Sequence, residues 1–208
     1  MGKETRIWFI IEANSLLDRI LERDNNIRYI IDFADEGKIE IKTSEISWEE
    51  IESALFGEVM YHRKLALELE KRSKDLRRGR YTEYGSLLNN TADSLKALSR
   101  EIEQKSRRDI EKLKTVIDTL PFNGDILAEA TKITFNPLFG LKLADAVHFV
   151  VAKNTAALKP DGVECIFFTK DKHFDNDLIR KELMKSGVLL YTKSGECVKF
   201  LRKKIINY

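Results

Sequence analysis

The sequence is poor in the residues that cross-link small domains or interrupt secondary structure. It has two cysteines and three prolines in 208 residues. Cys165 and Cys197 lie in apolar stretches and show no paired spacing, so nothing indicates a disulfide framework, a zinc ribbon or dithiol redox chemistry. We expect a protein of the reducing cytoplasm.

Long apolar runs and an excess of one charge are also lacking. No run approaches the roughly 18 to 20 residues that cross a bilayer, and residues 1–6 lead into a short apolar run without a signal-peptide pattern. Lysine and arginine number 36 against 34 acids, so the net charge of +2 identifies no partner. We expect a soluble intracellular protein with no membrane partner.

Apolar runs alternate with segments of helical periodicity along much of the chain. Strands are predicted at 7–11, 38–43, 163–169 and 188–191, with helices between them. Such an alternation predicts an α/β fold, in which a mainly parallel central sheet is flanked by helices on both faces.

The span 62–123 departs from that alternation. It has helical periodicity on both sides of an interruption at Gly79 and residues 81–90. We predict a helical hairpin inserted into a single domain of residues 1–208. Its basic stretch supplies candidate phosphate contacts, with a solvated helix face as the alternative; these residues are Lys71, Arg72, Lys74, Arg77, Arg78 and Arg80.

Several acids fall where a predicted strand meets a helix. Glu12 follows the first strand and Asp171 follows the third, whereas Asp145 lies inside the apolar run LADAVHFVVA. Reactive groups of open parallel sheets gather at the carboxyl edge. A carboxylate in apolar surroundings needs a cation, a hydrogen-bond donor or a metal, and converging carboxylates favour magnesium or manganese.

Other chemistries lack their residues. The sequence shows no glycine-rich phosphate loop, no serine–histidine–aspartate order and no cysteine nucleophile. His62, His148 and His173 show no metal-ligand spacing, so we expect them to be structural or surface residues.

Four blocks, in order, resemble the PIN-domain ribonucleases, whose small members include the VapC-like toxins. They are IIEANSLL from Ile10, SEISWEEIESAL from Ser44, KLADAVHFVVA from Lys142 and FFTKDKHF from Phe167. The blocks cover roughly residues 6–61 and 124–205. The resemblance therefore implies a PIN-like fold, with the helical hairpin as an addition that it does not explain.

The resemblance also implies a set of site residues. Glu12, Glu50, Asp145 and Asp171 become the metal-binding acids, and Asn14 and Thr169 the polar residues that orient them. Glu49 is adjacent to Glu50 and competes for its role. The chain departs from the family at Glu12, where the family has aspartate, and at His173, which replaces a frequent second aspartate and is expected to remove an accessory ligand.

The activity that this resemblance implies is a magnesium- or manganese-dependent endoribonuclease, of the toxin–antitoxin type, acting on RNA phosphodiester bonds. Three alternatives stay open at this point: a catalytically weakened PIN domain that binds RNA, a module that binds a protein partner or forms a homodimer through the helical insertion, and a structure-specific DNA nuclease. The sequence does not separate RNA from DNA.

Overall fold

The structure of the chain is a computed structural model, which describes residues 7–206. It divides into two compact units: a sheet unit, formed by the residues up to Glu49 and from Lys112 onward, and a hairpin unit, Glu50–Glu111. In the described part of the chain, no helix is both long and apolar enough to cross a lipid bilayer.

The sheet unit contains five strands, all of them parallel. Their order across the sheet is β3-β2-β1-β4-β5. The strands are β1 (Ile7–Ile11), β2 (Glu40–Ser44), β3 (Ile117–Leu120), β4 (Glu164–Phe168) and β5 (Val188–Tyr191). The expected α/β fold with a parallel central sheet is therefore confirmed, and its central strand β1 pairs Ile10 with Lys42 of β2 and with Phe167 of β4.

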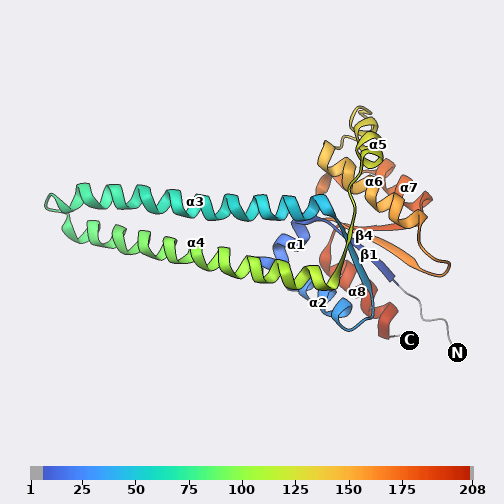
Figure 1. The fold of residues 1–208 in the computed structure, drawn as a ribbon, viewed down its shortest axis with the longest axis horizontal. Coiled ribbons are helices and arrows are strands. Elements are labelled where there is room, and N and C mark those ends of the chain that lie inside the picture. The colour runs from blue at the N-terminus through green and yellow to red at the C-terminus, as the bar shows by residue number, and fades with distance from the viewer. Residues whose placement is uncertain (1–6, 207–208) are drawn as a thin grey trace. The chain divides into compact units, whose positions relative to one another are not determined.

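Helices cover both faces of this sheet. Figure 1 shows α5, α6 and α7 on one side of the sheet and α2 and α8 on the other. These helices and the short helices near them are α1 (Ala13–Ile20), α2 (Asn25–Asp35), α5 (Gly124–Thr134), α6 (Leu143–Ala157), η1 (Lys172–Phe174), α7 (Asp177–Lys185) and α8 (Ser194–Ile206).

The core reflects the alternation of side chains along each strand. Ile10, Phe167 and Val188 face the layer of α5, α6 and α7 and join its buried cluster. On the opposite face, the rings of Phe9 and Phe168 stack with centroids 6.1 Å apart. Strands that bury both faces read as continuous apolar runs, which is why β1 and β4 are visible in the sequence.

Strand β3 is absent from the sequence prediction, which assigned residues 62–123 to the helical hairpin. The structure pairs Ile117 with Ile41 of β2, and the Lys42 ammonium reaches the Asp118 carboxylate at 2.8 Å. The predicted insertion, residues 62–123, thus includes a strand of the sheet. The segment has only four residues, and Asp118 and Thr119 are exposed, so its sequence lacks a strand pattern.

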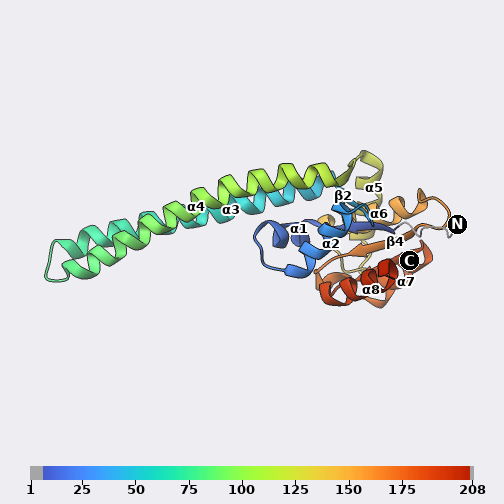
Figure 2. The same ribbon diagram turned by 90° about the horizontal axis from the view of Figure 1, so that it is seen from below.

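The hairpin unit contains most of two long helices, α3 (Glu45–Arg77) and α4 (Thr82–Val116). The first turn of α3 and the last turn of α4 belong to the sheet unit. Figures 1 and 2 show the two helices side by side along their length. Small residues line the seam, including Ala66 and Ser73 on α3 and Ala92 and Ser99 on α4, all of which are buried. Such residues let two helix backbones approach closely.

Candidate metal centre

The candidate site lies at the carboxyl ends of β1 and β4, within the sheet unit. From β1 the chain proceeds outward to β2 and β3, then returns to the other side of β1 for β4 and β5. The gap between the ends of β1 and β4 is therefore the point at which the strand order reverses. Ligands of open α/β sheets bind at this point, because the loops on either side diverge there.

Asp171 is held in place by the loop that leaves β4. Its N–H donates to the Thr169 hydroxyl at 2.9 Å, and its own Oδ1 accepts the N–H of His173 at 2.8 Å. Thr169 is fully buried and its N–H donates to the Tyr191 carbonyl at 3.1 Å. These contacts hold the backbone of Asp171 at the end of the sheet, and the orienting role that the resemblance implies for Thr169 remains a prediction.

Asp145 projects from the first turn of α6. Its side chain is 14% exposed, and its buried Oδ2 has no hydrogen bond of good geometry. Burial raises the pKa of this carboxyl, and repulsion from Asp171 raises it further, whereas His173 acts in the opposite direction. The nearest donor to this oxygen is Nδ1 of His173, at a long 3.4 Å, and a buried carboxylate oxygen with so weak a contact favours a cation nearby.

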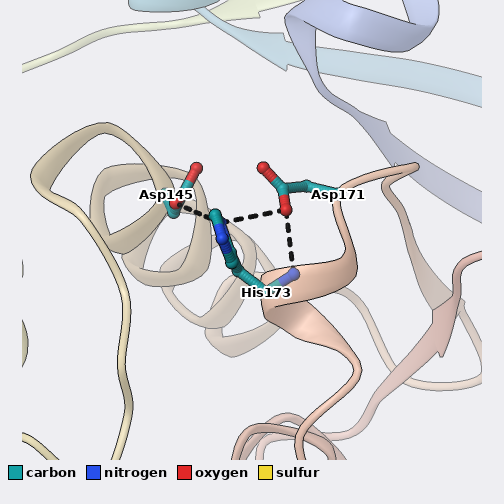
Figure 3. Close-up of side chains that lie close together, drawn as sticks. All are labelled: Asp145, Asp171 and His173. Atoms are coloured by element: carbon teal, nitrogen blue, oxygen red, sulfur yellow. Dashed lines mark hydrogen bonds and ion pairs between the residues drawn. The ribbon is translucent and has the colours of Figure 1, made fainter.

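His173 completes the group. Its Nδ1 lies 3.1 Å from Oδ1 of Asp171 and 3.4 Å from Oδ2 of Asp145 (Figure 3). One potential ligand atom from each of these three residues lies within 4.8 Å of the others, and no other such group of histidine, cysteine or acidic residues occurs in residues 7–206. His173 thus brings an imidazole nitrogen to the two carboxylates. Its side chain is 49% exposed, as expected of a surface residue, and its role as a ligand remains a prediction.

Glu12 is buried beside this group but does not belong to it. The side chain is 3% exposed, and its Oε1 accepts the N–H of Lys170 at 3.0 Å. Burial raises the pKa of Glu12, while the nearby His148 and the hydrogen bond from Thr169 lower it. Glu12 precedes α1 without capping it, so its carboxylate serves the β4 loop instead of its own helix.

A lysine clamp anchors the same loop from the other side. The Lys170 ammonium lies 2.5 Å from Oδ2 of Asp18 and 2.7 Å from Oδ2 of Asp24. Burial opposes ionisation of Asp24, but the hydrogen bonds from Lys170 and Ser194 lower its pKa below the usual value. One residue therefore ties the end of β4 to the α1–α2 segment through its side chain and to Glu12 through its backbone.

A row of buried polar groups lies behind Glu12. The hydroxyls of Ser44 and Ser47 are 2.9 Å apart, and Ser44 Oγ lies 3.4 Å from Nδ1 of His148. The Thr43 hydroxyl donates to the Ile11 carbonyl at 2.7 Å. The buried position of His148 agrees with the structural role expected for it, and these contacts join the ends of β1 and β2 to α6.

The other predicted site residues lie outside this cluster. Asn14 is exposed on α1, so its orienting role remains a prediction. Glu49 is exposed, whereas Glu50 is half-buried and is the first residue of the hairpin unit. The choice between these two glutamates, and the ligand role of either, also remains a prediction.

The six predicted phosphate-binding residues belong to the hairpin unit. They are exposed, and they lie on the last turns of α3 and in the turn that follows; they are Lys71, Arg72, Lys74, Arg77, Arg78 and Arg80. Their exposure satisfies one requirement for contacts with a polyanion, and their function remains a prediction.

Comparison with known proteins gives no close relative. No protein-family model matches the chain, and no curated protein matches it. Among solved structures, the chain is similar to the "Crystal structure of VapBC2 from Rickettsia felis bound to a DNA fragment from their promoter", with a TM-score of 0.45 and 10% sequence identity. The match covers 88% of this chain and 97% of that chain. This likeness is too distant to transfer an activity.

Proposed function

We propose that the chain is a metal-dependent endoribonuclease with its reaction centre at Asp145, Asp171 and His173. One observation supports this most directly: three potential ligand atoms converge at the strand-order reversal, and one of the oxygens, Oδ2 of Asp145, is buried with only the long 3.4 Å contact to His173. The four sequence blocks that resemble PIN-domain ribonucleases support the same reading independently of the geometry.

The side chains at the centre fit a divalent cation. Two carboxylates are hard oxygen ligands suited to magnesium and manganese, and an imidazole nitrogen suits transition metals better than magnesium. Manganese is thus the ion we expect to bind best. When bound, such an ion activates water and neutralises charge developing at a phosphodiester.

The remaining residues of the centre position its ligands. Asp171 is oriented by Thr169 and by its cap on η1, and the Lys170 N–H holds Glu12 against the same loop. The sequence resemblance also makes Glu12 and Glu50 ligands. We retain both as proposals, with Glu12 having a second role as the acceptor that fixes the Lys170–Asp171 backbone.

The substrate class follows from the resemblance and from the charge of the hairpin. RNA is the proposed substrate, and the exposed cations from Lys71 to Arg80 are proposed to contact its phosphates, because clustered exposed cations attract a polyanion. This proposal places the protein in the cytoplasm, as a toxin-like ribonuclease that a protein partner binding the hairpin could restrain.

A metal-and-substrate matrix tests the activity. Purified protein is incubated with mixed single-stranded RNAs and with DNAs of the same sequences, each with manganese, with magnesium and with a chelator. We expect RNA cleavage that is strongest with manganese and absent with chelator. Cleavage in the chelator would overturn the proposed chemistry, cleavage of DNA alone would make the chain a DNA nuclease, and metal binding without cleavage would make it a weakened, binding-only domain.

A further inference from the structure

The turn of the hairpin carries an exposed apolar surface that the proposed reaction centre does not use. Tyr84 is 64% exposed, Leu87 is 62% exposed and Tyr81 is 48% exposed. With Leu76 and Leu88 these side chains line a shallow hollow of about 430 Å³, which we call the tip hollow. Large apolar side chains exposed together mark a binding surface more often than single ones do.

The tip hollow is preformed, because the two helices meet closely beneath it. The Ser73 hydroxyl donates to the Gly85 carbonyl at 2.6 Å. A Cβ at Gly85 would lie 2.9 Å from the Ser73 carbonyl oxygen and 2.8 Å from Cγ of Arg77, so only glycine fits there without a shift. This contact fixes α4 against α3 at the residues that display the two tyrosines.

The cations around the tip hollow differ from those farther along the hairpin. Farther along the hairpin, several cations are paired with acids: Arg63 and Arg107 with Glu103, and Lys96 with Glu70. By contrast, the segment 71–84 has six basic and two acidic residues. None of its six described cations pairs with an acid, and the Arg80 guanidinium lies 5.2 Å from the centroid of the Tyr81 ring.

We propose that the tip hollow binds single-stranded nucleic acid, with bases stacking on Tyr81 and Tyr84 and phosphates contacting the unpaired cations. Proteins that hold single strands combine these two elements, a cationic track for the backbone and aromatic faces for the bases. The tyrosine rings are exposed and meet edge to face, with centroids 6.3 Å apart, so they present faces in different directions.

Charge decides among the occupants of such a surface. A second copy of the tip would bring six unpaired cations against six others, and that repulsion opposes self-association. Duplex nucleic acid satisfies the cations but keeps its bases stacked inside, away from the tyrosines. A single strand satisfies both the cations and the rings.

The inference rests on the proposed function only for its substrate class, and binding can be measured without cleavage. The probe is a fluorescent oligouridylate of about 20 nucleotides, a length that exceeds the site size of one small binding surface. A duplex of equal length is the comparison. Full-length protein is titrated in chelator, so that no cleavage occurs, and the folding of every variant is checked by circular dichroism.

The aromatic arm compares two double variants. The serine pair carries Tyr81→Ser and Tyr84→Ser, and the phenylalanine pair carries Tyr81→Phe and Tyr84→Phe. Loss of both rings should weaken oligouridylate binding by about tenfold or more, since each stacked base contributes roughly one order of magnitude in affinity. The phenylalanine pair should bind nearly as the unmodified protein does. Duplex binding should be the same for both. If the serine pair fails to fold, Tyr84→Ser alone gives the same comparison.

The charge arm also compares two double variants. The first carries Arg77→Glu and Arg78→Glu, at the end of α3 and in the turn after it. The second carries Arg107→Glu and Arg108→Glu, which make an equal change of charge on α4, away from the turn. The first pair should weaken both probes and reduce the slope of log affinity against log salt by about 1.4 for the single strand, roughly 0.7 per lost phosphate contact. The second pair should have a much smaller effect.

Three results would overturn the inference: no oligouridylate binding at low salt, equal binding by the serine and phenylalanine pairs, or serine variants that lose only self-association in light scattering. Cleavage with manganese is scored separately. Single-strand binding without cleavage would support the tip hollow as a binding surface and overturn the proposed nuclease activity. Cleavage together with unaltered binding by the serine pair would support the nuclease activity and overturn the binding role of the tip hollow.

Discussion

The two units assemble their charged surfaces in opposite ways. In the sheet unit, Asp145 and Asp171 come from segments far apart in the sequence, and each is partly buried and constrained by its neighbours. In the hairpin unit, the charged and aromatic residues around the turn lie in one continuous stretch and are exposed. The first arrangement depends on the whole fold, and the second on one local turn.

This difference predicts how each unit responds to substitution. The charged groups at the sheet edge are packed and paired, so a change there shifts the stability of the sheet unit, upward where it relieves repulsion and downward where it breaks a contact. The hairpin surface is made by local helical contacts, and a change there should alter binding while leaving the sheet unit intact. Four predictions test this contrast, beginning with the largest expected effect.

Removing one carboxylate from the centre should abolish its chemistry without unfolding it. We expect Asp145→Asn and Asp171→Asn each to reduce manganese-dependent cleavage by at least about a hundredfold, since even changes to supporting residues cost roughly 10- to 100-fold. Thermal stability in chelator should stay the same or rise, because the neutral amide removes repulsion between the carboxylates. Asp175→Asn, at an exposed residue directly after η1, is the control and should retain activity. Near-normal cleavage by either variant would remove that residue from the ligand set.

Breaking the lysine clamp should destabilise the sheet unit. Lys170→Met leaves Asp18 and Asp24 without their shared ammonium, and we expect a loss of about 1–3 kcal/mol in the free energy of unfolding, measured in urea. Because the pKa of Asp24 is lowered in the folded state, this contribution is present above its unfolded pKa and is lost as the pH falls. Lys193→Met, which breaks an exposed pair with Glu196, should cost less than about 1 kcal/mol. Equal effects would show that the clamp contributes nothing beyond a surface ion pair.

Two glycines on the hairpin should respond with opposite signs. Gly85→Ala forces a Cβ against the Ser73 carbonyl oxygen, and we expect a net loss of about 1–2 kcal/mol from this overpacking. Gly57→Ala meets nothing within 4 Å on α3, so the helix propensity of alanine should stabilise it by about 0.5–1 kcal/mol. Hydrogen exchange of the hairpin amides measures both. Stabilisation by both alanines would mean that the close approach at Gly85 is absent.

The smallest effect concerns the pH dependence of Glu12. Its pKa is raised in the folded state by burial, so its stabilising contribution is full below its unfolded pKa and is lost as the pH rises through the folded value. Glu12→Gln should therefore gain stability relative to the unmodified protein as the pH rises above the ordinary glutamate pKa of about 4.3. Melting temperatures in chelator, at several pH values, measure the difference. If the difference in melting temperature between the variant and the unmodified protein did not change with pH, the Glu12 carboxylate would be more exposed to solvent than the structure shows.

The sequence predicted those parts of the fold that have a local pattern. Strands β1 and β4 are apolar runs because both of their faces are buried, whereas β3 follows a helix directly and is exposed at Asp118 and Thr119. Only the pairing of β3 with β2 makes it a strand, and a sequence pattern cannot report that pairing.

The site was predictable to a similar extent. The ends of β1 and β4 indicated Glu12 and Asp171, because parallel strands bring their carboxyl ends to one edge. His173 belongs to the centre because its ring contacts Asp145, which lies nearly thirty residues earlier in the sequence. Its position two residues after Asp171 was the available signal. The hydrogen bond from the Lys170 N–H to Glu12 arises from the path of the β4 loop and has no counterpart in composition or spacing.

Both thiols of the chain lie in the sheet unit, and each is fully shielded. Burial raises the pKa of Cys165 to about 11 and that of Cys197 to about 12, so neither forms the reactive thiolate at neutral pH. The hairpin unit, Glu50–Glu111, contains no cysteine. The rate at which an alkylating reagent modifies the native protein therefore measures opening of the sheet unit alone. Unfolding of the hairpin adds no modified thiol, and each modified thiol shows that β4 or α8 has become exposed to solvent.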